Sequence, residues 1–92
     1  MIRSFRHKGL NRLFEDGDRK LIRPDLVAKI ENILFVLNLA KTPDEMNLPG
    51  FRLHPLKGDL KGFWSVTVRA NWRIVFRFVG PDAADVDLID YH

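Results

Sequence analysis

Residues 62–78 read GFWSVTVRANWRIVFRF, and in each half of this stretch large apolar side chains alternate with polar or smaller ones. A period of two residues is typical of a β-strand with one face on a core. Ala70 and Asn71 separate the halves, and asparagine tolerates the positive φ that a tight turn requires. The stretch therefore predicts strands over 62–69 and 72–78 joined as a hairpin. Trp64 and Trp72 are in phase with the apolar face, which predicts core positions for both.

Further strands flank this hairpin. Residues 80–82 have turn composition, and residues 84–91 alternate again, with Val86, Leu88 and Asp90 on one face. Residues 51–56 predict an edge strand, because Pro55 has no N–H to donate to a ladder. Residues 2–5 predict a short first strand.

Between these strands the period is that of helices. Residues 8–16 carry apolar residues at helical spacing and are followed by Gly17, a residue that commonly ends helices. Residues 24–41 begin with a proline and continue with apolar residues at i, i+3, i+4 and i+7, which predicts a longer amphipathic helix. Thr42 and Glu45 have the spacing of a capping box, in which each side chain accepts a hydrogen bond from the other residue's N–H. A single helical turn is expected before Pro49.

The order of these elements predicts an α+β fold. Two N-terminal helices, 8–16 and 24–41, are expected to pack on one face of a twisted, mainly antiparallel sheet. The chain has 92 residues, 46% of them hydrophobic, which suits a single domain over residues 1–92. A core of this size leaves no room for an enclosed cofactor cavity, so we expect no cofactor.

Composition excludes several kinds of chemistry. The chain has no cysteine, which rules out disulfides, zinc ribbons, iron–sulfur clusters and thiol nucleophiles. No stretch approaches the roughly 20 apolar residues of a membrane span, and residues 1–5 lack the apolar core of a signal peptide. We therefore expect a cytoplasmic protein that does not engage a membrane.

Charge is distributed unevenly, although the net charge is only +3. Residues 51–77 contain six Lys or Arg against one Asp, a balance of +5, whereas residues 78–92 contain four Asp and no Lys or Arg. The basic segment is where an anionic partner is expected. Lys57, Arg69 and Arg73 are its candidate ligands, and the alternative is that they are solvated charges on the outer face of the sheet.

Two histidines are candidates for proton transfer. His54 lies at the start of the basic segment, and the chain ends in Asp90-Tyr91-His92. On a strand, Asp90 and His92 project to one side about 7 Å apart, with Tyr91 opposite. The alternatives are an incidental loop histidine and a solvated terminal one. These residues lack the short helical spacing of a metal motif, so we expect no metal.

Several short motifs occur together along the chain: LHPLKGD at 53–59, GFWSV at 62–66, NWRIVF at 71–76 and DYH at 90–92, with IRSF at 2–5, HKGL at 7–10 and NLPG at 47–50. In this combination they resemble the HigB branch of the RelE/ParE toxins of bacterial toxin–antitoxin pairs. The resemblance covers nearly the whole chain but is weak over residues 15–41, so nothing functional is carried over there. Ala70 stands where relatives often have glycine or a small polar residue.

The resemblance implies a RelE-like microbial RNase fold. It also implies a toxin that enters the ribosomal A site and cuts messenger RNA without a metal when its antitoxin is degraded. The implied partners are a helix-turn-helix antitoxin of the HigA type and the 70S ribosome with its messenger and ribosomal RNA. Operator DNA would be contacted only through the antitoxin. The residues implied for catalysis are His54, Asp90, Tyr91 and His92, and those implied for binding RNA phosphates are Lys57, Arg69 and Arg73.

Residue chemistry agrees with this activity. RNA cleavage without a metal uses the 2′-hydroxyl as nucleophile, a base, an acid for the 5′-oxygen and positive charge at the phosphate. Imidazole suits both proton transfers, because its ordinary pKa is about 6.5. His92 and His54 are the expected pair, with their acid and base roles left open between them.

Two other functions remain as alternatives. A ParE-like toxin poisons DNA gyrase by binding alone, and that function predicts no essential histidine. A plain nucleic-acid-binding module predicts exposed aromatic side chains on the basic face, where Phe63 is the only candidate.

Overall fold

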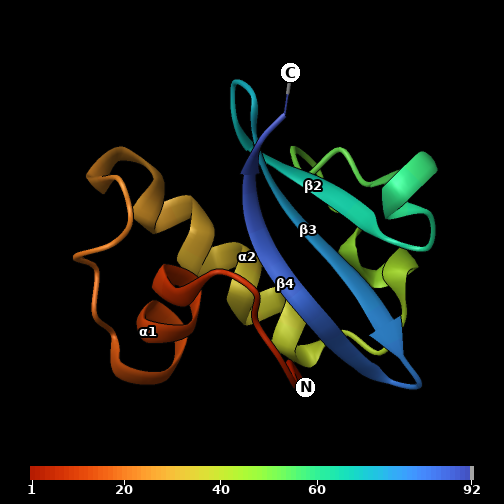
Figure 1. The fold of residues 1–92 in the computed structure, drawn as a ribbon, viewed down its shortest axis with the longest axis horizontal. Coiled ribbons are helices and arrows are strands. Elements are labelled where there is room, and N and C mark those ends of the chain that lie inside the picture. The colour runs from red at the N-terminus through yellow and green to blue at the C-terminus, as the bar shows by residue number, and fades with distance from the viewer. Residues whose placement is uncertain (92) are drawn as a thin grey trace.

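The computed structural model describes residues 1–91 and confirms the α+β fold. Its helices are α1 (Lys8–Asp16) and α2 (Val27–Leu39), with short 3-10 helices η1 (Pro24–Leu26), η2 (Pro43–Met46) and η3 (Gly58–Leu60). The strands β1 (His54–Pro55), β2 (Trp64–Arg69), β3 (Trp72–Val79) and β4 (Asp82–Asp90) form an antiparallel sheet in the order β1-β2-β3-β4. Figure 1 shows α1 and α2 on one side of the sheet, with the C-terminal end of β4 beside the β2–β3 turn.

Helix α1 has the predicted boundaries, and both ends are capped. At its start, Nδ1 of His7 accepts a hydrogen bond from the N–H of Leu10 at 3.2 Å. At its end, Gly17 adopts φ 68°, a left-handed conformation that glycine reaches without a Cβ clash. This local chemistry explains why the sequence pattern located the helix so closely.

The second predicted helix, 24–41, is shorter as an α-helix. Pro24 opens the 3-10 turn η1, and α2 ends at Leu39 because the backbone of Ala40 is extended, with φ −70° and ψ 143°. The predicted capping box between Thr42 and Glu45 was wrong: the Glu45 carboxylate accepts a hydrogen bond from the backbone N–H of Lys41, at 3.2 Å, and not from that of Thr42. Since η2 is a 3-10 turn, the N–H of Glu45 bonds to the main-chain carbonyl of Thr42, and the Thr42 hydroxyl is not needed.

The hairpin turn also differs from the prediction in one detail. Arg69 pairs with Trp72 across a two-residue loop, and the residue with positive φ is Ala70, at 50°, not Asn71. The register shifts between Thr67 and Arg69, so the turn is entered from an irregular strand end. Asparagine was predicted at the position with positive φ because of its intrinsic conformational preference. The irregular strand end places Ala70 in that conformation instead.

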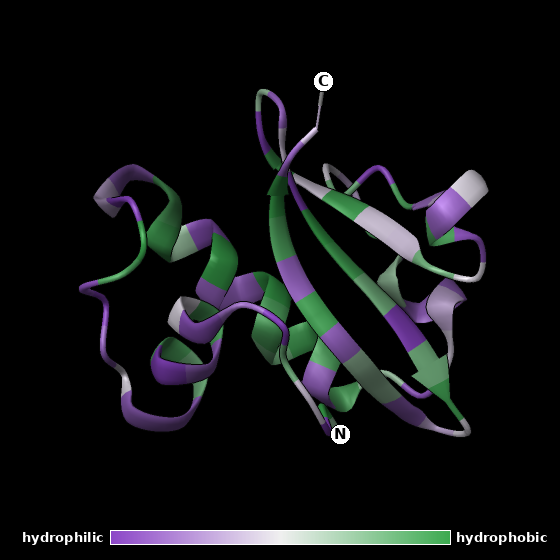
Figure 2. Ribbon diagram, in the orientation of Figure 1, coloured by the Kyte–Doolittle hydropathy of each residue, from purple (hydrophilic) through white to green (hydrophobic). Residues whose placement is uncertain are grey.

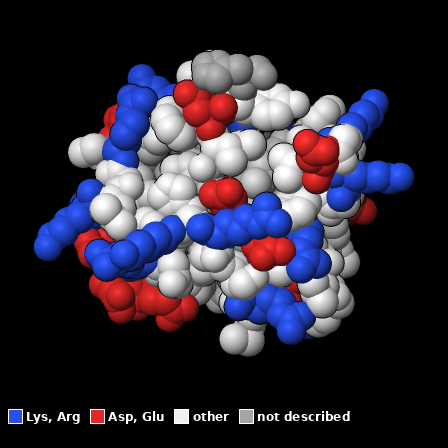
Figure 3. All heavy atoms as spheres, in the orientation of Figure 1, with Lys and Arg blue, Asp and Glu red and all other residues white. Residues whose placement is uncertain are grey.

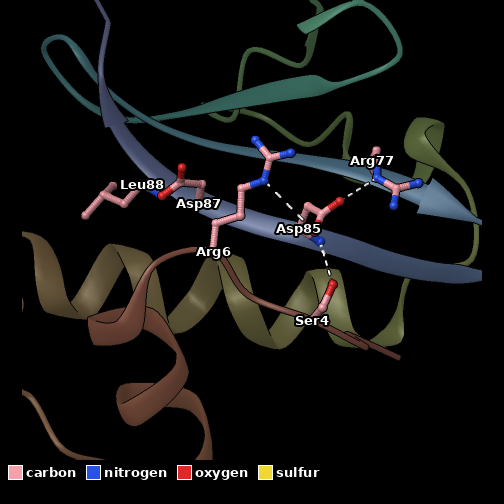
Figure 4. A network of polar contacts seen from close by, with 6 residues as sticks. All are labelled: Ser4, Arg6, Arg77, Asp85, Asp87 and Leu88. Carbon is pink, nitrogen blue, oxygen red and sulfur yellow. Dashed lines mark hydrogen bonds and ion pairs between the residues drawn. The ribbon is translucent and has the colours of Figure 1, made fainter.

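The N-terminal segment runs parallel to the edge of β4 instead of forming a continuous strand. Ile2 and Phe5 make isolated parallel bridges to Ala83 and Val86. Between the bridges, the Ser4 hydroxyl accepts a hydrogen bond from the N–H of Asp85 at 2.8 Å (Figure 4). Asp85 has φ 52°, and this irregular position in β4 interrupts the parallel ladder.

Asp85 is also the centre of an ionic network on the outer face of the sheet. Nε of Arg77 donates to the Asp85 carboxylate at 2.7 Å, and Nε of Arg6 lies 4.0 Å from it (Figure 4). The hydrogen bond from Arg77, with the charges of both arginines, lowers the pKa of Asp85 from its ordinary value. The network ties the N-terminal segment to β3 and β4.

The main core lies between the helices and the inner face of the sheet. Figure 2 shows hydrophobic and hydrophilic residues alternating along β4, as expected for a strand with one face on this core. Trp64 and Trp72 pack against the core as predicted. The largest fully buried side chains are Phe76, Leu10, Leu26, Ile30, Ile33, Leu34, Leu37 and Met46.

The outer face of the sheet is not simply solvated. Leu56, Phe63 and Val75 form a second buried cluster there, with Leu60 and Ile89 packed against it. Phe63 is only 8% exposed, and the guanidinium of Arg6 lies 5.1 Å from its ring centroid. The expectation that Phe63 is available for base stacking was therefore wrong.

Candidate active site

A pocket of about 230 Å³ lies on the outer face of the sheet, beyond the second apolar cluster. Its lining comes from β1 and the chain on either side of it, from β2 and β3, and from the residue after β4. The lining residues are Arg52, His54, Leu56, Ser65, Thr67, Arg73 and Tyr91.

Strand register brings these side chains together. His54 is paired with Ser65 between β1 and β2, and Thr67 with Arg73 between β2 and β3. Side chains of directly opposed residues lie about 4.5–5.5 Å apart at Cβ. Residues separated by up to 39 positions in the chain, from Arg52 to Tyr91, therefore face one small space.

The turn of the hairpin holds Arg73 and Tyr91. Nη1 of Arg73 donates to the carbonyl oxygen of Ala70 at 2.6 Å and to that of Trp72 at 3.3 Å. The N–H of Tyr91 donates to the carbonyl oxygen of Asn71 at 2.7 Å. The Arg73 guanidinium lies 6.0 Å from the Tyr91 ring centroid, at the limit of a cation–π contact. A cation and a phenol ring are thus positioned side by side at the pocket.

His54 enters the pocket from the edge strand. Its side chain forms no hydrogen bond or ion pair within residues 1–91, and the residue is exposed. Its ring nitrogens are therefore accessible to a bound molecule, as a proton donor or acceptor must be.

The remaining predicted site residues are placed differently. Asp90 ends β4 opposite Trp72 and is not part of the pocket lining. Lys57 is exposed and follows the lining residue Leu56. The Arg69 guanidinium lies 3.3 Å from the Asp25 carboxylate, outside the lining. His92 lies outside the described residues.

Three polar lining residues were not singled out from the sequence. Ser65 and Thr67 alternate with the core residues of β2, and that alternation already placed them on the basic face. Arg52 precedes His54 by two residues, which is the spacing of side chains on one face of a strand. The signal for all three was present but did not by itself separate pocket residues from solvated ones.

Tertiary contacts neutralise part of the basic segment. Arg69 pairs with Asp25 and Arg77 with Asp85, and the face seen in Figure 3 shows basic and acidic side chains interleaved. The acidic β4 is adjacent to the basic β3, so their charges meet. Arg52 and Arg73 at the pocket have no acidic partner within residues 1–91.

Other features of the described chain offer less chemistry. A hollow between α1 and α2 is lined by apolar side chains and Glu31. Over residues 1–91, no group of three or more His, Asp or Glu side chains is arranged to hold a metal ion. None of the helices formed by these residues has the length and apolar character to cross a membrane.

Residues 3–92 match the sequence profile of a family described as the RelE-like toxin of the type II toxin–antitoxin system HigB. The chain belongs to the HigB-like toxin family. Membership in a type II toxin–antitoxin family implies an antitoxin partner.

Two curated HigB relatives are similar in sequence. The protein named Endoribonuclease HigB of Proteus vulgaris is 47% identical over 92 residues, which is 100% of both chains. Toxin HigB-1 of Vibrio cholerae is 33% identical over 84 residues, covering 86% of this chain and 85% of the relative. The resemblance inferred from the short motifs is therefore confirmed.

Two solved structures share the fold. A mutant of YafQ from E. coli superimposes with a TM-score of 0.60 at 15% identity, over 95% of this chain and 89% of that chain. A YoeB/ParE toxin from Agrobacterium tumefaciens gives 0.58 at 22% identity, over 100% and 99% of the two chains. The HigB-like chain thus has the RelE-like fold.

Proposed function

We propose that this HigB-like toxin is an endoribonuclease that cuts messenger RNA. The observation that carries the proposal is the placement of His54, Arg73 and Tyr91 around one pocket. Proton transfer and phosphate binding are the chemistry that RNA cleavage requires. The name Endoribonuclease HigB, given to a relative identical at 47% of positions over the full length, supports the same activity.

The proposed reaction uses no metal and no cofactor. The 2′-hydroxyl of the message attacks the adjacent phosphorus, and its proton passes to one imidazole. The bond from phosphorus to the 5′-oxygen breaks, and a second imidazole protonates that oxygen. His54 and His92 are the two imidazoles, in either order. The products are a 2′,3′-cyclic phosphate and a 5′-hydroxyl.

The other site residues support these transfers. Arg73 neutralises the charge that develops on the phosphate. Tyr91 stacks on or orients a base through its ring, which lies beside the Arg73 guanidinium. Asp90 precedes His92 by two residues and orients its imidazole. Lys57 and Arg69 bind phosphates outside the pocket, and Arg69 exchanges its surface ion pair with Asp25 for RNA at little cost.

We also propose the setting in which the protein acts. The message is cut in the A site of the 70S ribosome, where ribosomal RNA also contacts the toxin, which places the activity in the cytoplasm. The antitoxin is a helix-turn-helix protein of the HigA type, and operator DNA is reached only through it. Residues 1–92 act as one domain.

The rival functions receive less support from the pocket. A gyrase poison that acts by binding needs no accessible imidazole, yet the exposed His54 lines the same pocket as Arg73. A module that stacks bases on the basic face would need exposed aromatic rings there, and Phe63 is buried under Arg6.

Single-turnover cleavage of a messenger on programmed ribosomes tests the function. We expect a single 2′-deoxy substitution at the scissile nucleotide to abolish the cut, and the natural message to yield a cyclic phosphate end. His54→Ala and His92→Ala should each lose about 10²–10⁴ in rate. Cleavage of the 2′-deoxy message would refute attack by the 2′-hydroxyl. Rates within about threefold of wild type for His54→Ala, Asp90→Ala and His92→Ala would refute the acid–base assignment.

A further inference from the structure

Arg52 interrupts the regular pairing between β2 and the segment before β1. The pairs His54 with Ser65 and Pro55 with Trp64 set a register that would continue with Arg52 opposite Thr67. Instead, the N–H of Thr67 donates to the carbonyl oxygen of Phe51 at 2.7 Å. One extra residue is accommodated at this point, in the manner of a β-bulge, and bulges beside functional sites re-aim side chains.

The backbone of Arg52 is strained in this arrangement. Its φ is 52°, in the left-handed region that favours glycine over residues with a Cβ. Its neighbour Phe51 is fixed on the core side: the residue is 3% exposed, and its backbone N–H donates to the carbonyl oxygen of Leu48 at 3.0 Å. Because such strain persists where surrounding contacts impose it, and collects at functional sites, this outlier calls for a functional explanation.

The guanidinium of Arg52 has no partner within residues 1–91. Among the arginines of this part of the chain, only Arg3 shares that property; the others contact an acidic, aromatic or carbonyl group. Arg52 lines the pocket, whereas Arg3 does not. An unpaired guanidinium held at the pocket by a strained backbone has five N–H donors available for an anion.

We propose that Arg52 binds the RNA phosphate next to the scissile one, and this inference rests on the proposed function. Arg52 approaches the pocket from the β1 edge of the sheet, while Arg73 approaches from β3, two strands away. Neighbouring strands are about 4.8 Å apart, so the two backbones are separated by roughly 10 Å. The two guanidiniums therefore flank the pocket, and the RNA backbone passes between them. Arg52 positions the message, and Arg73 acts at the reacting phosphate.

The experiment measures the single-turnover cleavage rate on programmed ribosomes against toxin concentration, at several salt concentrations. Arg52→Ala should raise the half-saturating concentration about tenfold while the maximal rate stays within threefold of wild type. The slope of log affinity against log salt should fall by about 0.7, the value for one phosphate contact with a single strand. Arg52→Lys should recover part of the affinity.

A glycine variant separates binding from folding. Arg52→Gly removes the guanidinium and relieves the left-handed strain, so it should melt at or above the wild-type temperature yet lose affinity as Arg52→Ala does. Arg3→Ala, which removes the other unpaired guanidinium away from the pocket, is the matched control and should cleave like wild type.

The outcomes distinguish this inference from the function on which it rests. In one outcome, wild-type protein cuts the message and Arg73→Ala slows the cut, while Arg52→Ala and Arg52→Gly match wild type. That result would refute the proposed role of Arg52 and leave the proposed nuclease activity supported. A lowered maximal rate with unchanged half-saturation would also refute positioning by Arg52. If wild-type protein makes no cut, both proposals fail.

Discussion

Replacing Arg73 by alanine tests the electrostatic part of the reaction most directly. A guanidinium carries five N–H donors, and the two on Nη1 are directed at the carbonyl oxygens of Ala70 and Trp72, at 2.6 and 3.3 Å. The three on Nε and Nη2 remain for a phosphate, enough for a bidentate contact. The turn thus holds the side chain in place before RNA arrives.

The expected loss follows from that arrangement. Removing a preorganised group that stabilises developing negative charge costs about 10²–10³ in rate, or roughly 2.7–4 kcal/mol. Arg73→Lys should fall between wild type and Arg73→Ala, because an ammonium cannot hold the turn carbonyls and a phosphate in the same geometry. Loss of the turn hydrogen bonds should lower the free energy of unfolding by only about 1 kcal/mol, so the variant stays folded.

The assay is single-turnover cleavage on programmed ribosomes, with a thermal melt of each variant. Arg77→Ala is the matched control: Arg77 lies on the same strand and face but pairs with Asp85 outside the pocket, and its removal should leave cleavage within threefold of wild type. A folded Arg73→Ala protein that cuts within threefold of wild type would overturn the assigned role of Arg73.

Three further predictions concern the fold. Asp85→Asn should lower stability at pH 7 by about 0.5–1 kcal/mol. Because the folded pKa of Asp85 is below its unfolded value of about 3.9, this difference should be complete above about pH 5 and vanish as pH falls through the folded pKa; urea titrations showing a pH-independent difference would contradict it. Ala70→Gly should raise the free energy of unfolding by about 0.5–1 kcal/mol, since glycine relieves the left-handed φ of 50°, and a lower melting temperature would refute this. Phe76→Ala, at a fully buried position, should cost about 3–5 kcal/mol in urea unfolding, and a loss under 1 kcal/mol would contradict its place in the core.

Local sequence was sufficient for the elements whose boundaries depend on neighbouring residues. Gly17 ends α1 by its own conformational freedom, and the alternation along 62–78 predicted the hairpin because side-chain direction in a strand repeats every two residues. Where the surrounding structure shapes the backbone, the sequence pattern predicted the element but not its detailed conformation. The bulged end of β2 moved the positive φ from Asn71 to Ala70, and the 3-10 form of η2 removed the need for a Thr42 side-chain cap.

The candidate site shows the same division. Motifs alone pointed to His54, Arg73 and Tyr91 as chemistry-bearing residues, because imidazole, guanidinium and phenol groups have properties that do not depend on fold. Register between distant strands then determined which of them meet, and it added Arg52. Sequence composition could not reveal that Arg69 turns toward Asp25 or that Arg6 covers Phe63. Both contacts join residues more than 40 positions apart, and only the packing of the N-terminal segment and helices on the sheet creates them.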